Sequence, residues 1–164
     1  MSLLRTTGRA ANWYGLRPAW QIPLEAVARR EHGTGLRLDL EPERIVYRLD
    51  IDVPGRRHPV PTAIVFYRWP PYSRWGLPPE EYPRVYAAPG ELSPHRMPGD
   101  DALCLYYPGS PEHERWRPSD GLLSLIDLTR NHLLFEDHWR ATGGHRGGVW
   151  LGAEAPHGFA EAAA

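Results

Sequence analysis

The chain has 164 residues, 41% of them hydrophobic and 24% charged, so it is long enough to bury the core of one domain. A formal net charge of −1 gives no overall electrostatic reason to bind nucleic acid. Because no apolar run approaches the roughly 20 residues of a membrane span and nothing resembles a signal peptide, we expect a cytoplasmic protein with neither nucleic acid nor membrane as a partner.

The first two thirds of the chain predict one short helix followed by strands. The weakly patterned N-terminal region contains a possible helix over residues 24–30. Further on, apolar and polar residues alternate with the period of a strand, or β-branched and aromatic residues cluster between prolines. Short turns between these segments favour an antiparallel four-stranded meander. The predicted strands are residues 36–40, 45–53, 62–69 and 84–87.

A long helix is predicted after the strands. Ser119 or Asp120 is suited to cap its start, apolar residues follow at helical spacing, and Gly143 and Gly144 are suited to end it. A helix of about 20 residues with one apolar face needs a sheet to cover that face. The sequence therefore predicts a single α+β domain over residues 1–164, with a frayed tail at 159–164.

Cys104 is the only cysteine, so the chain cannot form an internal disulfide. It lies in Leu103-Cys104-Leu105, within the loop that precedes the long helix, and His95 stands nine residues before it. One interpretation is a nucleophile, because a thiolate attacks carbonyl groups and also leaves well from a thioester. The other interpretation is a small hydrophobic residue packed in the core.

The order of short motifs around Cys104 resembles the core of ubiquitin-conjugating enzymes, over roughly residues 36–142. In that family a strand and a Tyr-Pro precede a Pro-x-Val strand, a His-Pro-Asn, a Cys-Leu, a Trp-x-Pro and a helix. Each motif is short, and the order of all of them carries the resemblance. The matching segments are Tyr82-Pro83-Arg84-Val85, His95, Leu103-Cys104-Leu105 and Trp116-Arg117-Pro118.

Three departures point from eukaryotic members of that family toward bacterial relatives. Arg96 and Met97 follow His95, so the Pro and Asn of His-Pro-Asn are missing, and the spacing from His95 to Cys104 is one residue shorter. The chain also stops soon after the long helix, which implies a truncated C-terminus. The ending from Trp150 to Gly158 is similar to the Trp-x-Gly and His-Gly ending of relatives encoded in anti-phage operons, including those with a cyclic-nucleotide synthase (CBASS).

The resemblance implies a thioester carrier. Cys104 would accept a protein C-terminus from an activating enzyme and pass it to an amine, with a cyclic-nucleotide synthase as the carried protein in CBASS anti-phage defence. One alternative is a conjugation pathway with a ubiquitin-like modifier as the carried protein. Others are a non-catalytic scaffold of the same fold, suggested by the missing Asn, and an unrelated α+β domain with a packed cysteine.

The candidate catalytic residues are Cys104, His95, His157 and Asp101. His95 or His157 is a candidate for the oxyanion stabilisation that the family obtains from Asn, as are backbone amides near Cys104. His95 could instead hydrogen-bond its own loop, and His157 could be a surface residue. Asp101, with Asp100, could activate an incoming amine or form an ordinary turn.

The sequence gives little reason to expect a metal site or a nucleotide cofactor. Asn131 and His132 are expected on a solvated face of the long helix, and His132, His138 and His145 are spaced wrongly for one metal site. Without a phosphate-binding or dinucleotide motif we expect no cofactor, and ATP-driven activation falls to another protein. All 19 basic residues are arginine, which is explained by a GC-rich genome or by avoidance of amines near an activated carboxyl group.

Overall fold

A computed structural model describes residues 12–153 and confirms the predicted α+β order. Helix α1 (Pro18–His32) comes first, a meander of β1 (Arg37–Leu40), β2 (Arg44–Ile51), β3 (Val60–Tyr67) and β4 (Arg84–Ala87) follows, and helix α2 (Gly121–Ala141) closes the fold. The sheet order is β1-β2-β3-β4 and every neighbouring pair is antiparallel. The tail predicted to fray over 159–164 lies outside the described residues.

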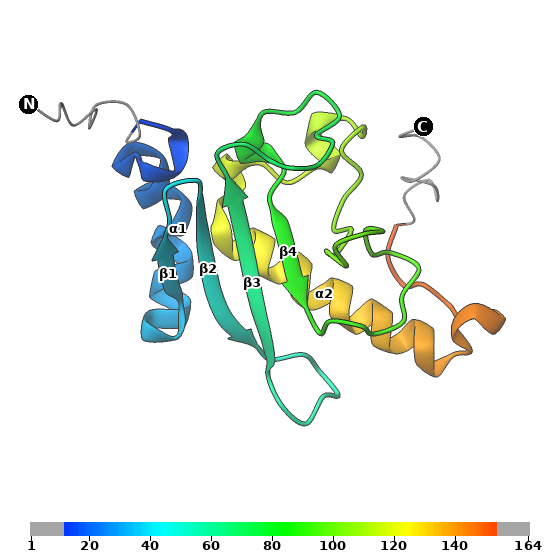
Figure 1. Cartoon of the computed structure of the whole chain (residues 1–164). Coiled ribbons are helices and arrows are strands. Elements are labelled where there is room, and N and C mark those ends of the chain that lie inside the picture. Colours follow the sequence, from blue (N-terminus) through cyan, green and yellow to red (C-terminus); the bar gives the residue numbers. More distant parts are fainter. Residues whose placement is uncertain (1–11, 154–164) are drawn as a thin grey trace, which may run out of the picture.

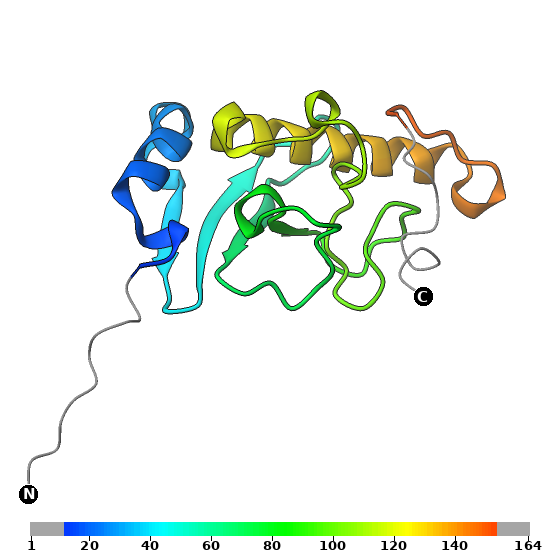
Figure 2. The same cartoon turned by 90° about the horizontal axis from the view of Figure 1, so that it is seen from above.

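The sheet and the two helices form two layers. Figures 1 and 2 show α1 and α2 on one side of the sheet, with α2 running obliquely across it. On β2, Tyr47, Leu49 and Ile51 are buried while Arg48 and Asp50 are exposed, as the alternating sequence predicts. These apolar side chains join a core with residues of both helices, so the apolar face of α2 is covered by the sheet and by α1 together.

Helix α1 is much longer than the predicted 24–30 segment. It starts at Pro18, whose fixed φ suits the first helical position, and ends before Gly33. Gly33 has a φ of 54°, a left-handed conformation that glycine adopts without a steric penalty. The sequence underestimates the length of α1 because Pro23 lies inside it, and an internal proline ordinarily argues against a helix.

The long helix is placed nearly as predicted. Asp120 precedes α2, but its carboxylate accepts a hydrogen bond from the Arg117 backbone N–H (2.8 Å) and so stabilises a 3₁₀ turn over Pro118–Asp120. At the other end the helix stops at Ala141, just before Gly143 and Gly144. No helix within residues 12–153 is long and apolar enough to cross a membrane.

Candidate functional site

The loop between β4 and α2 folds back on itself and fixes Cys104 by its backbone. The Cys104 N–H donates to the His95 carbonyl (2.9 Å), and the Met97 N–H donates to the Ala102 carbonyl (2.7 Å). The Leu103 N–H donates to Val85 on β4 (2.9 Å), which attaches this small hairpin to the sheet edge. Cys104 and His95 are therefore held next to each other by their backbones.

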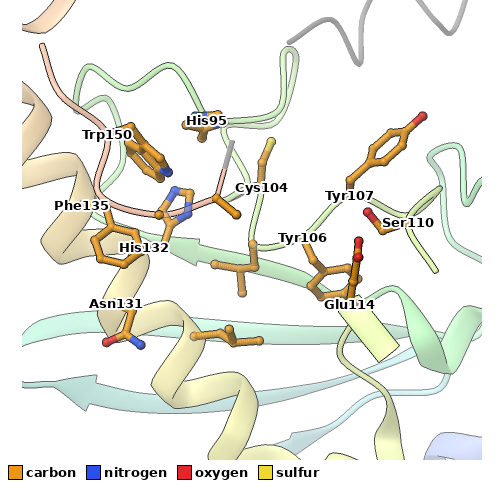
Figure 3. A pocket seen from close by; sticks show the side chains of 14 residues that line it. His95, Cys104, Tyr106, Tyr107, Ser110, Glu114, Asn131, His132, Phe135 and Trp150 are labelled. Atoms are coloured by element: carbon orange, nitrogen blue, oxygen red, sulfur yellow. The ribbon is translucent and has the colours of Figure 1, made fainter. Parts of the chain in front are cut away.

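Cys104 lines a pocket of about 500 Å³ between this loop, α2 and the segment after α2. Figure 3 shows Cys104 on the loop and His132 on α2 among the lining residues, with the Cys104 sulfur directed away from the His132 ring. Most of the wall is aromatic or aliphatic, and Glu114 is its one carboxylate among the described residues. The lining includes His95, Cys104, Tyr106, His132, Phe135 and Trp150.

The Cys104 thiol is protonated at rest. Burial raises its pKa to about 12, the charges of Asp100 and Glu136 act in the same direction, and Arg84 opposes them. The thiol donates to the Met97 thioether, with 3.1 Å between the two sulfur atoms. Met97 occupies the sequence position of the family's missing Asn, so the group beside the thiol at that place is an acceptor rather than a hydrogen-bond donor.

His95 is buried and lies against the pocket wall. Its ring packs on Trp150 with 4.3 Å between centroids. Its backbone carbonyl receives the Cys104 hydrogen bond, and its backbone N–H donates to the Ser93 hydroxyl (3.1 Å). His95 thus contributes to the position of Cys104 through its backbone, while its side chain lines the pocket.

Asp101 is placed in the turn of the hairpin rather than in the pocket. It adopts a φ of 59°, and its carboxylate accepts from Arg96 (3.1 Å) and from the Gly90 N–H (2.8 Å). Asp100 is similarly engaged by Arg84 (3.0 Å). Both carboxylates hold the loop, the turn role that the sequence left open for them. His157, the remaining candidate, lies outside the described residues.

The expectation of a solvated face at His132 was wrong. The His132 side chain is only 5% exposed, and its Nε2 lies 3.2 Å from the Glu136 carboxylate, which is fully buried. Arg96, one residue after His95, makes a two-pronged ion pair with the same carboxylate (2.9 and 2.8 Å). This face of α2 can be buried because His132 and Glu136 are hydrogen-bonded there, to each other and, for Glu136, to Arg96.

The buried Glu136 is ionised. Burial alone raises a carboxyl pKa, but the hydrogen bonds from His132 and Arg96 outweigh that effect and lower the pKa of Glu136 to about 2. The cluster of Glu136, His132 and Arg96 was not predicted from the sequence. The available signals were a His and a Glu four residues apart, hence on one helix face, and an Arg directly after the motif histidine.

Trp116 and Trp150 both anchor the packing around this site. Trp116 is 2% exposed, and its indole N–H donates to the Gly121 carbonyl (2.9 Å), which ties the end of the loop to the start of α2. Trp150 contacts the rings of His95, His132 and Phe135. The segment after α2 therefore contributes one wall of the Cys104 pocket.

The arrangement offers a thiol and two imidazoles around one aromatic pocket. Such a site suits nucleophilic acyl chemistry, in which a thiol forms a covalent intermediate and an imidazole moves protons. Within residues 12–153, no three His, Cys, Asp or Glu side chains are grouped so as to hold a metal ion. Comparison with known proteins adds no relative, since no family model, curated protein or solved structure matches the chain.

Proposed function

We propose that this protein is an acyl carrier of the ubiquitin-conjugating type, with Cys104 as the residue that holds the acyl group. The observation that carries the proposal is the single thiol in the wall of a pocket of about 500 Å³. The order of α1, the meander, the Cys104 loop and α2 supports it, because the resemblance of the motifs implies this order.

The proposed chemistry is a pair of acyl transfers without oxidation or reduction. First, the Cys104 sulfur attacks the thioester of an activating enzyme. A new C–S bond forms, the donor's C–S bond breaks, and the thiol proton ends on the donor's sulfur. Second, an amine attacks the acyl carbon, the bond to Cys104 breaks, and an amine proton returns to the Cys104 sulfur. No redox cofactor is needed for either step.

The absence of lysine suits a carrier, because the loaded acyl group meets no lysine amine on its own chain. Burial raises the pKa of Cys104 to about 12, so the thiol must lose its proton as the new C–S bond forms.

Within this class we favour the CBASS setting, in which the carried protein is a cyclic-nucleotide synthase. The alternative is a pathway that carries a ubiquitin-like modifier. In either setting an activating enzyme is the required partner, because the sequence contains no phosphate-binding or dinucleotide motif that would bind ATP. The genes next to this one distinguish the two settings.

A non-catalytic scaffold is the second candidate function, and Met97 favours it. The thioether next to Cys104 cannot donate a hydrogen bond to an oxyanion. A protein that has lost the Asn of its family would then bind the same partners without carrying an acyl group. The two candidates differ in whether Cys104 is needed.

Co-expression with the neighbouring genes tests the proposal. The wild-type protein is purified with its partners and run on a non-reducing gel with and without added thiol, beside Cys104→Ala and Cys104→Ser. We expect a thiol-sensitive higher band in the wild type, none in the alanine variant and a thiol-resistant ester band in the serine variant. Mass spectrometry of the band names the carried protein. Co-purifying partners without any such band would contradict the carrier and favour the scaffold.

A further inference from the structure

The chain reverses direction directly after α2. The Gly148 N–H donates to the Gly144 carbonyl (2.8 Å), and the Val149 N–H donates to the Thr142 hydroxyl (2.8 Å). The turn is tight, because a Cβ atom on Gly148 would lie only 2.6 Å from the Gly144 nitrogen. The residues that follow are therefore directed back along α2 toward the Cys104 loop.

Residues 149–153, called the strap below, pass over the pocket, and Trp150 is the side chain that holds them there. The centroid of the Trp150 ring lies 4.3 Å from that of His95, 5.2 Å from that of His132 and 5.7 Å from that of Phe135. Two of these partners belong to α2 and one belongs to the Cys104 loop. A single ring thus joins the strap to both neighbouring walls.

The rest of the strap is weakly attached. Val149 and Leu151, on either side of Trp150, are each 51% exposed. The backbone of residues 150–153 makes no hydrogen bond to any other residue of the described range 12–153. Segments with few buried contacts and few backbone hydrogen bonds are the ones that open locally while the fold stays intact.

The strap and the thiol belong to one pocket. Trp150, Gly152 and Ala153 line it together with Cys104. Figure 3 shows Trp150 beside His95, and the His95 carbonyl accepts the hydrogen bond from the Cys104 N–H (2.9 Å). The position of Trp150 against His95 therefore sets how close the strap lies to the loop that carries the thiol.

We infer that Trp150 is a specificity-determining residue of this pocket, because it holds the strap closed and so limits the width of the groups that reach Cys104. A narrow group enters beside the closed strap, whereas a wide group requires the strap to open. As a property of the carrier, the inference rests on the proposed acyl transfer and names its substrate class as acyl groups without bulky side chains near the reacting carbon.

A packing role for Trp150 alone leads to a different expectation. Loss of packing lowers the stability of the whole fold, and the unfolded chain exposes Cys104 to narrow and wide reagents alike. Selection by a strap, in contrast, discriminates between reagents by their width while the protein stays folded. The two roles are therefore separated by comparing reagents of different size.

Two alkylating reagents with the same reactive group make this comparison. Iodoacetamide is the narrow reagent and iodoacetamidofluorescein the wide one, and the mass of the intact chain reports labelling, with Cys104→Ala as the blank. Both reagents react with the thiolate, so the fraction of thiolate cancels in the ratio of the two rates. Division by the ratio for the protein unfolded in urea removes the intrinsic difference between the reagents.

Four variants separate the strap from general stability. Trp150→Ala removes the ring and Trp150→Phe keeps an aromatic one. Gly152→Ala retains Trp150 but adds a Cβ atom that would lie 2.7 Å from the Phe135 ring, which displaces the strap. Leu151→Ala is the matched control, since Leu151 is in the strap but does not line the pocket.

Urea unfolding of each variant gives its unfolded fraction, and only labelling faster than that fraction allows is assigned to the folded protein. We expect the wild type to exclude the wide reagent, and Trp150→Ala to lose this discrimination by at least about 10-fold, because three ring contacts disappear. Gly152→Ala should change in the same direction. Trp150→Phe and Leu151→Ala should remain close to the wild type.

Three results would overturn the inference. The first is a wild-type ratio equal to that of the unfolded protein, and the second is an unchanged ratio in Trp150→Ala. The third is a wild type that neither reagent labels beyond its unfolded fraction, since the closed strap should still admit the narrow one. None of these results decides the proposed function, which the gel experiment with the neighbouring proteins tests separately.

Discussion

At the scale of single residues, Glu136 is the polar group on which the site depends most. Its carboxylate is fully buried and receives Arg96 and His132, so it connects α2 to the hairpin that holds Cys104. A buried carboxylate is tolerated only where such partners replace water. Stability and site geometry are therefore coupled at this residue.

Replacement of Glu136 by Ala should destabilise the fold strongly. The change removes the two-pronged partner of the buried Arg96 guanidinium and leaves it only the more exposed Asp101 carboxylate; breaking a buried ion pair in this way typically costs about 3–5 kcal/mol. Urea unfolding followed by circular dichroism measures this loss. Glu31→Ala, at an exposed position of α1, should stay within about 0.5 kcal/mol. Equal effects of the two changes would contradict the role given to Glu136.

Acid should remove the stabilisation that the ionised Glu136 carboxylate gives to the fold. The pKa of Glu136 is about 2 in the folded protein, against about 4.3 for an ordinary glutamate. A carboxyl with a depressed folded pKa stabilises the fold fully above its unfolded pKa and loses that effect as pH falls through its folded pKa. We expect roughly 3 kcal/mol to be lost between about pH 5 and pH 2. Glu136→Gln should flatten this part of the stability profile, and an unchanged slope would argue against it.

The Cys104 thiol should react slowly with iodoacetamide in the folded protein. Because burial raises its pKa to about 12, the thiolate at pH 8 is rarer by a factor of roughly 1000 than in an exposed cysteine. Alkylation, followed by mass, should be at least about 100-fold slower than in the same protein unfolded in urea. Comparable rates in the two states would show that the thiol is not desolvated.

At the scale of elements, the contact between α1 and α2 closes the helical layer over the sheet. Ala28 is fully buried, and Leu24 one turn earlier is 2% exposed. Small and large side chains of α1 thus alternate along the face that meets the core. This contact fixes the start of α2 and, through α2, the wall that carries His132 and Glu136.

A larger side chain at position 28 should therefore destabilise the fold. Ala28→Leu adds volume where no space exists, which typically costs about 1–3 kcal/mol. Ala26→Leu is the matched control, because Ala26 lies on the exposed side of the same helix. Thermal melting of the two variants checks the prediction. If both melt alike, the two helices are not packed as closely as the structure shows.

At the scale of the whole molecule, residues 12–153 share one core. Buried side chains of both helices and of β2, β3 and β4 join it, together with Leu103 beside Cys104 and Trp116 before α2. The site is therefore built onto the same core that stabilises the fold. Cooperative loss of the site and of the fold is the expected behaviour of such a small unit.

Urea unfolding should thus show one transition. Tryptophan fluorescence reports on the seven tryptophans, which are spread over the structure and include the buried Trp13, Trp116 and Trp139. Far-ultraviolet circular dichroism reports on the backbone. The two curves should coincide. An earlier fluorescence transition would mean that the segment with Trp150 or the Cys104 loop unfolds separately.

The order of elements was readable from the sequence because its signals are local. Alternation with a period of two located the first two strands, and a run of β-branched and aromatic residues that ends at prolines located the third. The predicted fourth strand, residues 84–87, matches β4. Helical spacing of leucines and two glycines located α2 to within a few residues. The length of α1 was missed because Pro23 interrupts the local pattern, whereas packing of Leu24 and Ala28 on the core stabilises the helix around it.

The sequence by itself determined the α+β order and the position of one thiol in a loop before the long helix. Only the tertiary structure decided which polar groups meet at that thiol. It brought His132 and Glu136 to Arg96, about 40 residues away in sequence, set Met97 against Cys104, and placed Asp101 in a turn. Hydrophobic periodicity reports which face of an element is buried, but pairing of buried charges depends on how distant segments approach each other, and that is settled by packing.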